Sequence, residues 1–127
     1  MTPTGLANTW ALPPDPGPAR RELQALLEES HWPGDVDAVV LAVHEAMINA
    51  ERHGGGATSA TAEVTGSSIT VEVRDQGPGF DLKSQAQQRP DALAERGRGL
   101  WLISQIAQSW DVRRRGRETC LRLRFQA

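Results

Sequence analysis

The segment VHEAMINAERHG, residues 43–54, holds a histidine and a glutamate side by side, as some metal-binding and phosphoryl-accepting helices do. A zinc-protease helix needs a second histidine four residues after the first, and Ile48 occupies that position after His44. A phosphoryl-accepting histidine is normally followed, after its glutamate, by a basic residue and Thr-Pro, whereas Ala46-Met47-Ile48 follow here. Both roles are therefore excluded for His44.

Glu45 and Asn49 of the same segment are one helical turn apart and lie away from the apolar residues Val43 and Met47. Taken alone, this pair fits a polar stripe that faces solvent. Its interpretation therefore depends on the residues further along the chain.

The segment DQGPGF, residues 75–80, cannot continue the alternating strand that precedes it. An aspartate at a strand end can accept a hydrogen bond from an exocyclic amine, and glycines such as Gly77 and Gly79 let the backbone approach a flat ring or a phosphate. The pattern Asp-x-Gly-x-Gly is also a common turn, so by itself it does not identify a binding site.

The segment GRGL, residues 97–100, directly precedes a helical pattern. Glycines at a helix N-terminus expose backbone N–H groups to an anion, and the helix dipole favours negative charge there. Arg96 and Arg98 flank Gly97 and can neutralise phosphate charge, although arginines in a solvated loop are the alternative.

The elements that position these residues follow from periodicity and turn chemistry. An edge strand is predicted around residues 10–12, a helix opens at Pro18, and Asp35 caps a second helix that ends at the glycines 54–56. Strands are predicted at 58–64, 69–74, 110–114 and 118–125, a polar loop at 81–95 and a third helix at 100–108. This order predicts an α+β fold, a two-layer sandwich with helices on one face of a mixed, mainly antiparallel sheet. Residues 1–17 are expected to be an N-terminal extension and residues 18–127 one domain.

Composition narrows the class of protein. The chain has 127 residues, 24% of them charged and 39% hydrophobic, which suits one folded domain. One cysteine excludes an internal disulfide framework, and no signal peptide or membrane-spanning stretch is visible, so a cytoplasmic location is expected.

Residues 96–127 carry eight arginines and two acids. This asymmetry can mark a nucleic-acid surface, but no aromatic residues are interleaved with the arginines, which favours solvation of the turn region RRRGR.

The order of the three motifs is more specific than any one of them. A helix with Glu-x-x-x-Asn, a strand that ends in Asp-x-Gly-x-Gly, and Gly-x-Gly at a later helix start resemble the N, G1 and G2 boxes of the GHKL ATP-binding superfamily (the Bergerat, or histidine-kinase-like ATPase, fold). The resemblance covers residues 35–125. The short length, the box spacing and the text GRGLWLI are similar to the bacterial anti-sigma-factor serine kinases.

The resemblance implies a role for each matching residue. Glu45 matches the general base, which polarises a water or the serine hydroxyl of a protein substrate, and Asn49 matches the asparagine that holds Mg²⁺. One amide oxygen together with nucleotide phosphates is a sufficient Mg²⁺ site, since this ion usually keeps several waters. Asp75 matches the aspartate that reads the adenine amine, with Gly77 and Gly79 beside the base.

On the phosphate side, Gly97 and Gly99 match the lid glycines, with Arg96, Arg98 and Leu100 as neighbouring nucleotide-binding positions.

Two further matches are single residues. Thr119 matches a threonine that supports the aspartate, often through water. His53, next to Gly54, matches a His-Gly that ends the N-box helix, and a plain capping histidine is an equal alternative.

The implied function is that of a kinase that uses ATP and Mg²⁺, inhibits a sigma factor and phosphorylates a serine of an anti-anti-sigma (STAS-type) protein. ATP and ADP forms are expected to differ as loop 81–95 orders over the phosphates. Glu95-Arg96-Gly97 lack the small residue that the branch often has before the first glycine, so a catalytically silent ATP-gated binding module is the alternative. Nucleic-acid binding is the weaker rival. A homodimer through the N-terminal strand and first helix is expected.

Overall fold

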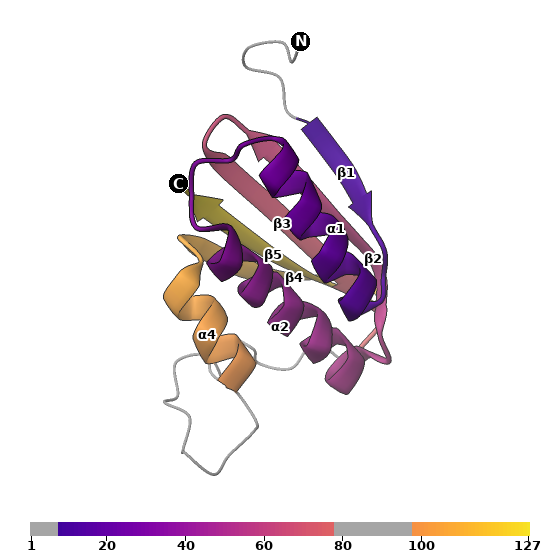
Figure 1. Cartoon of the computed structure of the whole chain (residues 1–127). Helices are drawn as coiled ribbons and strands as arrows, with labels where there is room; N and C mark the ends of the chain where they lie inside the picture. The colour runs from indigo at the N-terminus through magenta and orange to yellow at the C-terminus, as the bar shows by residue number, and fades with distance from the viewer. Residues whose placement is uncertain (1–7, 78–97) are drawn as a thin grey trace.

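The fold places all helices on one face of a single antiparallel sheet, in a computed structural model that describes residues 8–77 and 98–127, without the side chains of residues 53, 54 and 98 (Figure 1). Within those residues there are five strands and three helices. The predicted α+β two-layer class is confirmed. Every strand pair described is antiparallel. The strands are β1 (Asn8–Leu12), β2 (Ala57–Thr65), β3 (Ser68–Asp75), β4 (Ser109–Arg115) and β5 (Glu118–Gln126).

The sheet has the strand order β1-β2-β3-β5-β4, so β1 and β4 are its edges. Strand β1 therefore lies where the sequence predicts an edge strand, and it joins residues 8–12 to the same sheet as the rest of the domain. The division of the chain at residue 17 stays a prediction. At the start of β2 the register shifts so that Thr58 is an extra residue between the pairs Ala57–Asp75 and Ser59–Arg74. Such a bulge bends the strand, and here it adjoins Asp75.

Three helices cover the sheet: α1 (Pro16–Glu29), α2 (Val36–Gly54) and α4 (Arg98–Ile106). Helix α2 is central, with α1 and α4 both packed against it. Helix α1 begins two residues before the predicted Pro18, because Pro16 has the fixed φ that suits the first helical turn. Asp35 caps α2 as predicted, its Oδ1 accepting a hydrogen bond of 3.1 Å from the Ala38 N–H. Gly55, with φ of 73°, ends α2 in the left-handed conformation.

The hydrophobic core lies between the helices and the sheet. Helix α2 contributes the stripe Val39, Val43, Met47 and Ala50, all at most 3% exposed. Strands β3 and β5 contribute alternate residues, which include the predicted inward set Thr119, Leu121, Leu123 and Phe125. The connection between α1 and α2 is held by Trp32, whose Nε1 donates to the Ser67 carbonyl at 3.1 Å.

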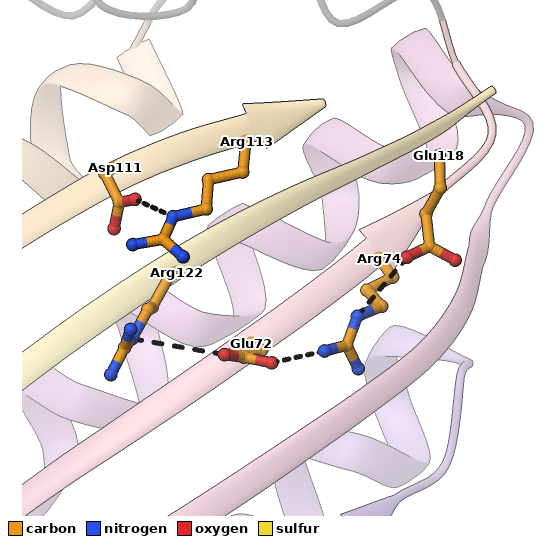
Figure 2. A network of polar contacts seen from close by, with 6 residues as sticks. All are labelled: Glu72, Arg74, Asp111, Arg113, Glu118 and Arg122. Carbon is orange, nitrogen blue, oxygen red and sulfur yellow. Dashed lines mark hydrogen bonds and ion pairs between the residues drawn. The ribbon is translucent and has the colours of Figure 1, made fainter. Parts of the chain in front are cut away.

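The opposite face of the sheet carries charged side chains, with no helix packed on it in the described residues (Figure 2). Glu72 of β3 lies between Arg74, at 2.6 Å, and Arg122 of β5, at 4.0 Å. Arg74 also contacts Glu118 at 3.5 Å. These pairs are partly exposed, so each contributes at most about 1 kcal/mol.

None of the helices described is both long and apolar enough to cross a membrane.

Candidate functional site

Glu45 and Asn49 project from α2 toward the start of α4, where they meet Gly99. A Cβ atom on Gly99 would lie 2.8 Å from Glu45 Oε2 and 3.6 Å from Asn49 Nδ2. Gly99 therefore has no room for a side chain unless the carboxylate moves. The structure brings together three residues that the sequence takes from two separate motifs.

The local sequence explains why this pair faces α4. The apolar stripe of α2 packs on the sheet, and Glu45 and Asn49 lie on the flank of the helix next to that stripe. Both residues are half-buried, whereas Glu51 and Arg52 of the same helix are exposed. The pair is thus neither core nor the fully solvated stripe that the sequence alone favours.

Two buried side-chain atoms lack a hydrogen-bond partner within the described part of the chain: His44 Nδ1 and Asn49 Nδ2. A buried unpaired amide costs roughly 1–3 kcal/mol and indicates an unfilled interaction. For Asn49 this unpaired group lies beside Gly99, the glycine at the N-terminal end of α4. The asparagine that is predicted to face a ligand therefore has unused hydrogen-bonding capacity there.

Asp75 is the last residue of β3 and closes a tight turn. Its Oδ1 accepts a hydrogen bond of 2.7 Å from the Gly77 N–H. One carboxylate oxygen is thereby fixed, and the other is left for a further donor. Gly77 is itself buried.

The Gly77 carbonyl is held by two side chains from the far strands. Thr119, which is 3% exposed, donates from Oγ1 to it at 3.1 Å. Arg114 donates from Nη1 to the same carbonyl at 2.6 Å and to Thr119 Oγ1 at 3.1 Å. In the ladders Arg114 pairs with Thr119, and Thr119 pairs with Asp75, so the three form one row across β4, β5 and β3. The described contacts of Thr119 thus support the turn after Asp75.

These two groups of residues lie at the same end of the domain. Helix α2 ends at Gly54 and the chain passes through two glycines to Ala57, which pairs with Asp75. Asn49 is five residues before that helix end, a rise of about 7.5 Å. The helix flank and the end of β3 are therefore neighbours in space.

The structure describes only some of the remaining predicted residues. His53 lies in the last turn of α2, and Arg98 opens α4, but their side chains are outside the description. Leu100 is 1% exposed and packs in the core, and its part in nucleotide binding stays a prediction. Gly79, Arg96 and Gly97, and the loop predicted at 81–95, lie outside the described residues.

Arg114 is a site residue that sequence reasoning missed. It lies in RRRGR, whose charge the sequence favours as solvation of a turn region, although a strand is predicted at 110–114; β4 extends to Arg115 and the turn follows at Gly116. Alternation along the strand was the signal that could have found it, because Val112 and Arg114 share the face that points to the helices.

The described residues contain no group of three or more His, Cys, Asp or Glu side chains arranged to hold a metal ion. A Mg²⁺ ion that is bound mainly by phosphates and water needs no such cluster. Asn49 could supply its side-chain oxygen to such an ion, while the unpaired atom, Nδ2, is a donor that suits a phosphate oxygen.

A helical layer on one face of an antiparallel sheet, with a polar helix flank beside a strand-end aspartate, defines a class of nucleotide-binding α+β domains. A family model described as histidine kinase-like ATPase domain matches residues 9–125. The chain therefore belongs to the histidine kinase-like ATPase family, a family of ATP-binding domains.

Among solved structures, the Acinetobacter baumannii histidine kinase AdeS is similar to this chain, with a TM-score of 0.51 and 13% identity over 94% of this chain and 67% of that one. At this identity the similarity concerns the fold alone. No curated protein matches the chain.

Proposed function

We propose that this chain is an anti-sigma-factor serine kinase, which binds ATP, inhibits a sigma factor and phosphorylates a serine of a STAS-type anti-anti-sigma protein. The observation that carries the proposal is the meeting of Glu45, Asn49 and Gly99 between α2 and α4, next to the strand end that bears Asp75. The finer assignment comes from the text GRGLWLI and the compact order of the motifs.

The base of the nucleotide is recognised by Asp75. Its carboxylate has one oxygen engaged by the Gly77 N–H, which leaves the other to accept a hydrogen bond from the adenine amine. Gly77 lacks a side chain, so its peptide can lie against the ring. Thr119 holds the same turn from β5.

The phosphates lie at the start of α4 in this proposal. The first N–H groups of a helix have no partner within the helix, and they favour an anion. Asn49 would offer its amide oxygen to Mg²⁺, an ion that neutralises phosphate charge when it is bound. Gly99 keeps the space between α2 and α4 open, since a larger residue would displace Glu45.

Glu45 acts as the general base. Its carboxylate takes the proton of the substrate serine hydroxyl while that oxygen bonds to the terminal phosphorus and ADP leaves. A general base must reach this proton, and Glu45 is half-buried beside the helix end at which the phosphates would bind. Positioning supplies most of the acceleration in phosphoryl transfer, so few protein groups are needed.

Thermal unfolding in ATP, ADP and GTP, each with and without Mg²⁺, tests nucleotide binding. A ligand present at 100 times its Kd stabilises the folded chain by about 2.7 kcal/mol, so adenine nucleotides raise Tm by several degrees and GTP raises it less. If no adenine nucleotide at millimolar concentration shifts Tm, the nucleotide site is absent.

Glu45→Gln separates the kinase from its alternative, the ATP-gated binding module that Glu95-Arg96-Gly97 motivates. In a kinase, this change abolishes transfer of label from γ-labelled ATP to a STAS-type protein while ATP binding persists. Glu51→Gln is the matched control, because Glu51 is an exposed carboxylate of the same helix. Wild-type protein that binds ATP and a sigma factor but transfers no label supports the binding module.

The cytoplasmic location and the homodimer through β1 and α1 belong to the same proposal. Strand β1 is a sheet edge in the described residues, and an edge strand presents unpaired backbone groups that a second copy can use. Nucleic-acid binding would be revealed by steeply salt-dependent retention on DNA or RNA.

A further inference from the structure

Arg114, Thr119 and the Gly77 carbonyl form a closed triangle of hydrogen bonds. Arg114 Nη1 donates to the Gly77 carbonyl oxygen at 2.6 Å and to Thr119 Oγ1 at 3.1 Å, and Thr119 Oγ1 donates to the same carbonyl at 3.1 Å. Each of the two Nη1 protons of Arg114 and the hydroxyl proton of Thr119 therefore has an acceptor. The carbonyl has two lone pairs and two donors, so its orientation is fixed.

The triangle also fixes the Asp75 side chain, although none of its three hydrogen bonds involves that side chain. The N–H of Gly77 donates to Asp75 Oδ1, while the carbonyl of the same residue is held by Arg114 and Thr119. Both the N–H and the carbonyl group of Gly77 are therefore held by hydrogen bonds. A glycine has more backbone freedom than any other residue, so this turn needs these hydrogen bonds to hold one conformation.

The charge on Arg114 makes it the stronger of the two donors. A hydrogen bond to or from an ionised group is shorter and stronger than one between neutral groups. As a residue Arg114 is exposed, which means that the core does not need its side chain.

We infer that Arg114 is a positioning residue for base recognition: through the Gly77 carbonyl it holds the free oxygen of Asp75 where an exocyclic amine of the bound purine can reach it. The inference rests on the proposed nucleotide site. Under this inference Arg114 helps the protein to discriminate between purines with and without that amine. It does not act through a general attraction of phosphates.

The experiment measures Kd by calorimetry for ATP and for purine riboside 5′-triphosphate, which has the same phosphates and ring but no 6-amino group. The variants are Arg114→Ala, Arg114→Lys and Thr119→Val. Arg115→Ala is the matched control, because Arg115 is the next residue of β4 and carries the same charge but makes no hydrogen bond to Gly77 within the described residues. Circular dichroism checks that each variant is folded, and Arg114→Gln replaces the alanine variant if the latter unfolds.

Wild-type protein is expected to bind ATP at least about tenfold more tightly than the analogue, as one amine hydrogen bond to a carboxylate predicts. In Arg114→Ala this ratio falls at least about threefold, since ATP affinity drops while analogue affinity changes little. Arg114→Lys restores most of the ratio, because an ammonium group can donate to the same carbonyl. Arg115→Ala keeps the wild-type ratio.

A double-mutant cycle adds a second readout. Because Arg114 and Thr119 hold the same carbonyl, the combined variant loses less discrimination than the product of the two single losses. A purely structural role for either residue would not produce this coupling in the ratio.

Two results overturn the inference. In the first, Arg114→Ala weakens the binding of ATP and of the analogue equally, which would mean that Arg114 attracts the phosphates or stabilises the fold. In the second, the ratio is unchanged. Both differ from failure of the nucleotide site itself, in which wild-type protein binds neither ligand.

Discussion

Arg113, Arg114 and Arg115 have the same side chain but different surroundings. Arg114 points to the helical side of the sheet and contacts Gly77, whereas Arg113 points to the opposite face and contacts Asp111 at 3.1 Å. A shift of one residue in the register of β4 on β5 would exchange these roles. Strand alternation is enough to place Arg114 on the face of Val112, but a single sequence with three consecutive arginines does not determine the register of β4 on β5, so the contact of Arg114 with Gly77 could not be predicted.

Other site residues were predictable because their types are chemically restrictive. Asp75 and Gly77 stand out where a strand pattern stops, and Thr119 has the same parity as Leu121 and Leu123. The sequence does not show through which residue Asp75 and Thr119 are connected. Asp75 and Thr119 are cross-strand partners, and the described contacts join them through Gly77.

Cys120 lies on the open face of the sheet and is half-buried. Burial, and after it the negative charge of Glu72, raises the pKa of its thiol above the usual value of 9.0. The folded chain therefore holds the thiol proton more tightly than the unfolded chain does. The stability that this contributes is fully present below about pH 9 and is lost as pH rises through the folded pKa.

The reaction of this thiol with iodoacetamide tests the shift, since the thiolate is the nucleophile. We expect a pH–rate profile with a midpoint above 9.0 in the folded chain and near 9.0 in urea. Cys120 is the only cysteine, so no other thiol contributes. A folded midpoint at or below the unfolded one would contradict the described surroundings.

At the scale of elements, periodicity predicted each described helix and strand, with ends that differ by a few residues. Helix α4 runs from Arg98 to Ile106 rather than from residue 100 to 108, and Ser109 already belongs to β4. Helix ends fray, and their positions depend on neighbouring elements. The position of the apolar stripe does not depend on them. The packing of α4 on Glu45 depends on the tertiary fold, which a local pattern does not specify.

Two aspartates at helix starts allow a matched test of capping. Asp35 Oδ1 accepts a hydrogen bond from the Ala38 N–H, whereas Asp15 precedes α1 with no hydrogen bond from its side chain. We expect Asp35→Ala to lower the free energy of unfolding by about 1 kcal/mol, and Asp15→Ala to change it by less than about 0.5 kcal/mol. Urea denaturation of both variants measures this, and equal losses would contradict the assigned cap.

At the scale of the whole molecule, the charge asymmetry of the sequence becomes a difference between faces. One face of the sheet is covered by helices, and the other presents Arg113, Arg115, Arg122 and Arg124 together with a few acids. One helical layer means one core, so the stability of the domain depends on the single cluster of buried side chains between the helices and the sheet.

Leu23 tests that dependence. It is 0% exposed, while Leu26 on the same helix is only partly buried against the core. We expect Leu23→Ala to lower the free energy of unfolding by about 2–5 kcal/mol, and Leu26→Ala to lower it by clearly less. Urea midpoints at unchanged m-value report the difference. Similar losses for the two would mean that α1 is not packed as described.

Trp32 and Trp101 are two of the four tryptophans of the chain, and they lie in different parts of the fold. Trp32 is 7% exposed and bonded to Ser67, at the opposite end of β3 from Asp75, a distance of roughly 23 Å along the strand at about 3.3 Å per residue. Trp101 is half-buried in α4, two residues after Gly99. The emission of the four tryptophans overlaps, so variants that keep only one of them separate the signals: Trp32 alone would follow loss of the fold, and Trp101 alone would follow events at the start of α4.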